Sequence, residues 1–81
     1  MSKIIKLKAR YGVDNHLEQY QGNTYILKTD SPYIRTGVSN TGKEFVDPSG
    51  GPILIVGEKI GEETIASIGF IKDVGTVITL E

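Results

Sequence analysis

The 81-residue sequence contains no cysteine, no tryptophan and a single histidine, His16. Without cysteine there are no disulfide bonds and no thiolate metal sites, and one histidine argues against a histidine-built zinc site. We therefore expect neither a metal nor a cofactor. A chain this short buries only about 60–65% of its unfolded surface, so its core alone gives marginal stability. Association with a second copy, most simply as a two-fold dimer, is the expected additional source of stability.

The sequence also has no large excess of positive or negative residues, since its net charge is −1 and its pI is about 5.8. The whole-molecule basic field that favours nucleic-acid binding is therefore absent. The charge is uneven, however: residues 1–45 carry seven Lys/Arg against four Asp/Glu, and residues 46–81 carry two against six. A row of basic residues keeps a weak nucleic-acid-binding barrel as a hypothesis, although we expect little DNA binding. This row consists of Lys3, Lys6, Lys8 and Arg10.

Long apolar runs are missing as well. No run approaches the ~20 residues that cross a bilayer, and the first residues lack the apolar region of a secretory signal. We therefore expect a location in the cytoplasm and no membrane partner. The length of the chain predicts one domain over residues 1–81.

Short β-forming runs separated by glycine turns make up most of the sequence. Residues 3–11 alternate between apolar and cationic side chains, which is typical of a half-buried strand, and residues 23–29 read as another strand. Residues 33–46 predict a hairpin with Gly42 in the left-handed conformation. Residues 65–80 predict a second hairpin, with Gly75 in that role. The fold class expected is mostly β, a small antiparallel barrel or sandwich of about six or seven short strands.

Three segments give weaker patterns. Residues 12–22 contain turn residues and predict an irregular loop. The four consecutive β-forming residues of 53–56 predict a strand that is covered on both faces. Residues 62–68 fit either a strand or the one short helix that the fold class allows, although seven residues are marginal for a helix.

The sharpest change in composition is the glycine- and proline-rich segment 47–52, which leads directly into the apolar run 53–56. Glycine amides that no side chain covers can converge on a phosphate or carboxylate, and a serine hydroxyl adds a donor. The same composition is typical of a plain tight turn, and we consider that interpretation more common. The Gly-Lys-Ser/Thr ending of a P-loop is missing.

Arg35 supplies a second candidate contact for an anion, since a guanidinium offers paired N–H donors. Tyr33 lies two positions earlier and shares its strand face. The alternative is that Arg35 forms an ordinary surface ion pair with Glu44 or Asp47. If a ligand binds, we expect its site to be formed by seven residues. These are Tyr33, Arg35, Lys43, Asp47, Ser49, Gly50 and Gly51.

No complete catalytic motif is present, so we expect a protein that is not an enzyme and has no catalytic residues. His16 follows Asp14 and Asn15, but no nucleophile is nominated beside it. The leading hypothesis is a non-catalytic module that binds or sequesters a small anionic metabolite or nucleotide. The first alternative is a structural or protein-interaction subunit that forms a homo-oligomer, as compact viral and bacterial genes often encode.

Overall fold

The computed structural model describes residues 3–8, 13–31, 33–48 and 52–81. This part of the chain forms nine β-strands and no helix. The strands are β1 (Ile4–Leu7), β2 (Asn15–Gln21), β3 (Thr24–Thr29), β4 (Arg35–Val38), β5 (Glu44–Asp47), β6 (Leu54–Ile55), β7 (Lys59–Ile60), β8 (Glu63–Ile71) and β9 (Gly75–Leu80).

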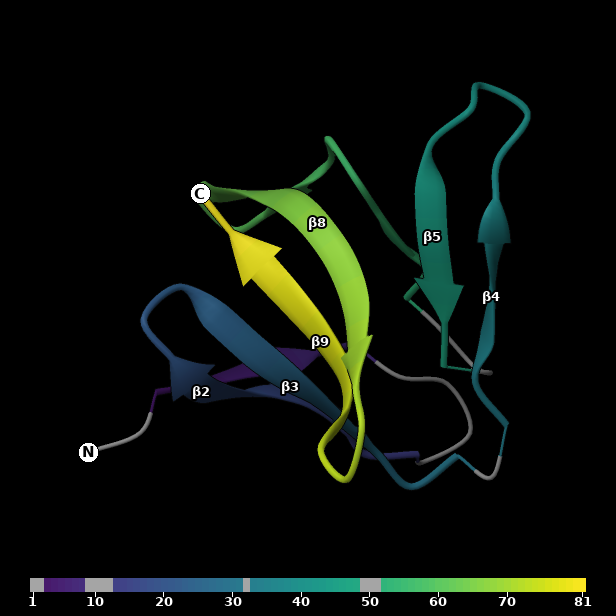
Figure 1. Ribbon diagram of the computed structural model, residues 1–81. Coiled ribbons are helices and arrows are strands. Elements are labelled where there is room, and N and C mark those ends of the chain that lie inside the picture. Colours follow the sequence, from purple (N-terminus) through teal and green to yellow (C-terminus); the bar gives the residue numbers. More distant parts are fainter. Residues whose placement is uncertain (1–2, 9–12, 32, 49–51) are drawn as a thin grey trace.

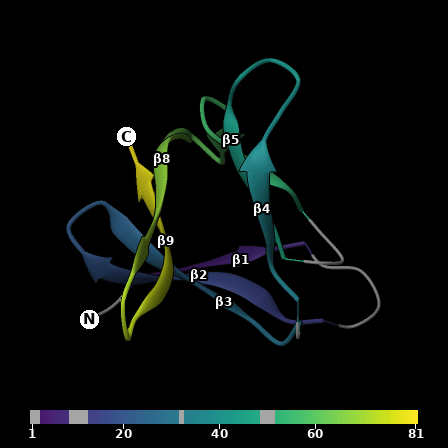
Figure 2. The same cartoon turned by 45° about the vertical axis from the view of Figure 1, so that its right-hand side comes forward.

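The strands belong to two antiparallel sheets. Six strands in the order β1-β2-β3-β9-β8-β7 form a strongly curved sheet that resembles half of a barrel (Figure 1). The other three, in the order β4-β5-β6, form a small sheet beside it. The loop of the β4–β5 hairpin projects away from the large sheet in both views (Figures 1 and 2). The predicted mostly-β class is confirmed.

The hydrophobic core joins the two sheets. Val46 and Leu54 come from the small sheet and are almost completely buried. They pack with six buried residues of the large sheet, because alternate side chains of each strand point to the same face. Those six are Leu17, Tyr25, Leu27, Ile65, Ile78 and Leu80.

The prediction of an irregular loop over residues 12–22 is wrong, because β2 occupies most of this segment. Asn15 and Leu17 are buried, and β2 pairs with β1 on one side and with β3 on the other. The β2–β3 turn has Gly22 at φ +57°, next to the Gln21–Thr24 pair. A positive φ at the first central residue is what a two-residue type II′ turn requires.

Both predicted hairpins are confirmed, with one addition to the turn geometry. Gly42 has φ +81° and its N–H donates to the carbonyl of Ser39 at 2.9 Å. In the β8–β9 hairpin Gly75 has the expected positive φ, at +116°, and Asp73, at φ +67°, lies in the left-handed region as well. Aspartate tolerates that region better than most residues do.

The structure corrects two other predictions, those for residues 62–68 and 53–56. Residues 62–68 lie mainly in β8, so the alternative of a short helix there is wrong. The predicted strand 53–56 shortens to β6, at the edge of the small sheet. Leu54 is buried, whereas Ile55 is half-buried and Ile53 is 48% exposed, so the second face of this segment is only partly covered.

Candidate functional site

The open end of the β4–β5 hairpin brings together two of the predicted site residues, Arg35 and Asp47. Arg35 and Asp47 are cross-strand partners, and Arg35 Nη2 lies 3.2 Å from Asp47 Oδ2. The Arg35 side chain is 73% exposed and that of Asp47 is 16% exposed. Tyr33, just before β4, is 74% exposed, and its N–H donates to Ser31 Oγ at 3.2 Å. The ion pair anticipated as the alternative for Arg35 is therefore present.

The remaining predicted residues do not join this group in the described structure. Lys43 lies at the opposite end of the hairpin, and its side chain runs along Gly57. Ser49, Gly50 and Gly51 lie outside the described residues. The predicted convergence of an arginine, an aromatic ring and glycine amides thus stays a prediction for its aromatic and glycine parts, and Lys43 does not contribute to it.

Strand β4 is the most exposed element of the fold. All four of its residues are exposed, and among the described strands its one neighbour is β5. Large apolar residues in or next to β4 are exposed too: Tyr33 is 74% exposed, Ile34 is 42% exposed and Val38 is 65% exposed. An exposed strand edge that carries apolar side chains is a template for pairing with another strand.

The hairpin geometry decides which backbone groups β4 presents at that edge. Ser39 N donates to Lys43 O at 2.8 Å, so these two residues form a hydrogen-bonded pair. Hydrogen-bonded and non-hydrogen-bonded pairs alternate along an antiparallel ladder. The pairs Val38–Glu44 and Thr36–Val46 are therefore non-hydrogen-bonded. It follows that the N–H and C=O groups of Thr36 and Val38 point away from β5, toward the open edge.

Phe45 lies across from Gly37 of β4, on the face of the small sheet that points away from the buried Val46. It pairs with Gly37, and a Cβ atom added to Gly37 would lie 3.1 Å from Phe45 Cε1. The ring therefore lies over a residue that has no side chain. The sequence gives no signal for this contact, because it depends on the register of the hairpin and a lone Gly-Phe combination does not reveal that register.

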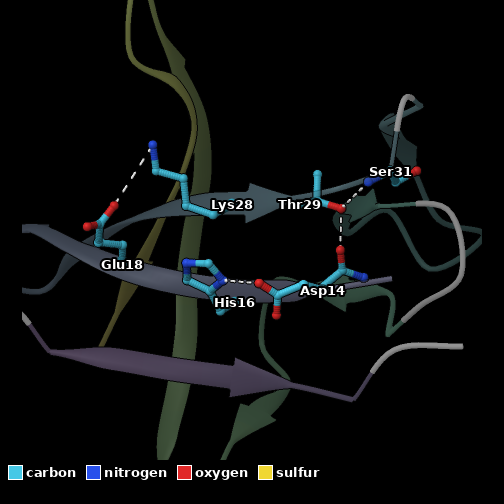
Figure 3. Close-up of polar contacts among 7 residues, drawn as sticks. Asp14, His16, Glu18, Lys28, Thr29 and Ser31 are labelled. Atoms are coloured by element: carbon cyan, nitrogen blue, oxygen red, sulfur yellow. Dashed lines mark hydrogen bonds and ion pairs between the residues drawn. The ribbon is translucent and has the colours of Figure 1, made fainter. Parts of the chain in front are cut away.

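A polar row on the large sheet is the second candidate site (Figure 3). The register aligns Lys6, His16 and Lys28 across β1, β2 and β3. His16 Nδ1 lies 3.3 Å from Asp14 Oδ2, and Lys28 Nζ lies 3.9 Å from Glu18 Oε2. A carboxylate thus lies beside His16 and another beside Lys28, which weakens the attraction of this row for an anion.

A chain of hydrogen bonds next to this row links Ser31 and Thr29 to the buried Asn15. Ser31 N–H donates to Thr29 Oγ1 at 2.9 Å, and Thr29 Oγ1 donates to Asn15 Oδ1 (Figure 3). Asn15 is 1% exposed. Asn15 and His16 are adjacent in an extended strand, so their side chains point to opposite faces and do not form a catalytic group together.

Comparisons with known proteins found no match among the family models, the curated proteins or the solved structures. In the part of the chain that the structure describes, no group of three or more His, Cys, Asp or Glu residues is arranged to hold a metal ion. The same described ranges contain no helix with the length and apolar character of a membrane span.

Proposed function

We propose that this protein is a non-catalytic structural subunit that associates with copies of itself through the open edge of β4. The observation that carries the proposal is that all four residues of β4 are exposed, and that the exposed apolar residues Tyr33, Ile34 and Val38 lie in or next to it. Edge strands are usually protected by charged side chains, prolines or bulges. Strand β4 carries a single charge, Arg35, and Asp47 of the same hairpin compensates it.

The contrast with β1 supports the choice of edge. β1 is also an edge strand, but three lysines lie in or beside it, and this is a common protection against edge-to-edge pairing. They are Lys3, Lys6 and Lys8. Like charges on two copies would repel each other there, whereas β4 imposes no such penalty. The proposal includes a cytoplasmic location for the subunit, as its sequence predicts.

Binding of a small anion is the second proposal. It is supported by the exposed guanidinium of Arg35 and by the exposed Tyr33 two residues earlier in the chain. The compensating carboxylate of Asp47 makes it the weaker of the two, since an incoming anion has to compete with that carboxylate. A rise in melting temperature with inorganic phosphate that disappears in Arg35→Ala would place it first.

Sedimentation equilibrium of the wild type and two Thr36 variants tests the first proposal. Thr36→Pro removes an N–H that points to the open edge and leaves the β4–β5 hydrogen bonds intact. We expect the wild type to be an oligomer and Thr36→Pro to be a monomer with an unchanged far-UV circular dichroism spectrum. Thr36→Val keeps the N–H and the branched side chain, so it should still associate. A wild type that stays monomeric at high micromolar concentration would contradict the proposal.

A further inference from the structure

We infer that β4 pairs antiparallel with β4 of a second copy about a two-fold axis at Thr36, which sets Arg35 against Gly37 and Phe45 of the partner subunit. This inference rests on the proposed function and specifies its partner and register. It is carried by the direction of the backbone groups, by the single charge of the strand and by the Phe45 ring over Gly37.

The backbone groups restrict the register. Two antiparallel strands can exchange hydrogen bonds only between residues whose N–H and C=O groups point toward each other. On β4 these residues are Thr36 and Val38, and the alternation continues to Ile34. A two-fold axis at Thr36 pairs Thr36 with its own copy and Ile34 with Val38 of the partner subunit. All the outward groups of this segment are then satisfied.

Charge and strand length argue against the two neighbouring registers. An axis at Arg35 would place two guanidinium groups directly opposite each other, which costs energy in a sheet. An axis at Gly37 would place Arg35 opposite Ser39 of the partner subunit. β4 ends at Val38, and the Ser39 carbonyl accepts from Gly42 N–H at 2.9 Å, so Ser39 already belongs to the turn. The axis at Thr36 avoids both conflicts.

The side chains in this register are complementary. Ile34 and Val38, which are 42% and 65% exposed in the single chain, lie opposite each other across the interface. Arg35 lies opposite Gly37 of the partner subunit, and that glycine has no side chain to obstruct it. The Phe45 ring over Gly37 is then within reach of the guanidinium, since cations favour aromatic faces within about 6 Å. The exposed contact of Arg35 with Asp47 contributes little, so giving it up costs little.

A second copy is the partner that this edge fits best, because Ile34 and Arg35 each face a suitable residue of the same segment in the other copy. A foreign extended peptide would need an apolar residue opposite Val38 and a small residue opposite Arg35. No other feature of the described residues favours a peptide of that kind. A pairing of β4 with a different edge would be heterologous and would produce rings or open-ended assemblies rather than a two-fold dimer. The antiparallel β4–β4 pairing closes as a dimer.

Single-cysteine variants test the register directly, since the wild-type chain contains no cysteine. The Cα atoms of a hydrogen-bonded antiparallel pair are about 5.5 Å apart, which a disulfide bond can span. Oxidation should therefore link Thr36→Cys rapidly into a covalent dimer. Val38→Cys is the matched control on the same exposed edge. In this register the two Val38 positions are about 14 Å apart, and the control should stay monomeric on a denaturing, non-reducing gel.

Two further variants test the interaction between Arg35 and the Phe45 ring. Arg35→Ala and Phe45→Leu should each raise the dimer dissociation constant by about 2- to 30-fold. Equal cross-linking of Thr36→Cys and Val38→Cys would overturn the register. A wild type that sediments as a dimer while Thr36→Cys remains unlinked would refute the inference and leave the proposed function standing. A wild type that remains monomeric would refute both.

Discussion

Thr29 connects the buried side chain of Asn15 to the backbone of the half-buried Ser31. Its hydroxyl donates to Asn15, which is 1% exposed, and accepts from Ser31 N–H. Thr29→Val keeps the shape of the side chain and removes both hydrogen bonds. We expect it to lower the free energy of unfolding by about 1–3 kcal/mol, measured by urea denaturation. Thr29→Ser keeps the hydroxyl and should lose less. A valine variant as stable as the wild type would show that this chain of hydrogen bonds contributes nothing to stability.

At the residue scale, the sequence predicts the partner in an ion pair better than it predicts which side chains lie next to each other across two strands. The pairing of Arg35 with Asp47 was one of two alternatives, and the hairpin register selects it. The separation of Lys43 from this pair follows from the same register. The Gly37–Phe45 contact could not be predicted, because the position of a ring over a glycine depends on which residues face each other across two strands.

Gly42 is the residue that the β4–β5 hairpin depends on most directly. It has φ +81°, and the left-handed region costs a residue with a Cβ about 1–2 kcal/mol. Gly42→Ala should therefore lower the free energy of unfolding by about that amount. Gly69→Ala is the matched control, because an added Cβ there would lie 3.7 Å from Val77 Cγ2, an ordinary contact. The control should change stability little or raise it slightly. Equal losses in the two variants would disprove the conformational explanation.

At the element scale, alternation and turn residues predicted most strands, and the failures have a common cause. The residues of β2, Asn-His-Leu-Glu-Gln-Tyr-Gln, include few strong β-formers. This segment becomes a strand because it pairs on both sides, with β1 and with β3. The run 53–56 has strong strand propensity but lies at an edge. Propensity is local, whereas the position of a strand within a sheet is set by partners distant in sequence.

At the scale of the whole molecule, two small sheets share one core. Val46 is completely buried and packs with residues of the large sheet, although it belongs to the small one. The partner sheets therefore stabilise each other, and neither has a separate core of its own among the described residues. We expect the two sheets to unfold as a single cooperative unit, which is the usual behaviour of small domains.

Val46→Ala tests that cooperativity against Val38→Ala in protein dilute enough to be dissociated, where Val38 is 65% exposed. Removing buried methyl groups at Val46 should cost about 2–3 kcal/mol, whereas the exposed substitution should stay within about 0.5 kcal/mol. In dilute protein, hydrogen exchange should show that Val46→Ala lowers the protection of β2 and β3 amides as much as that of β5 amides. Loss of protection confined to β4, β5 and β6 would instead mean that the small sheet opens by itself. Pairing through the β4 edge would then stabilise a sheet that the core holds only weakly, and association would raise its protection selectively.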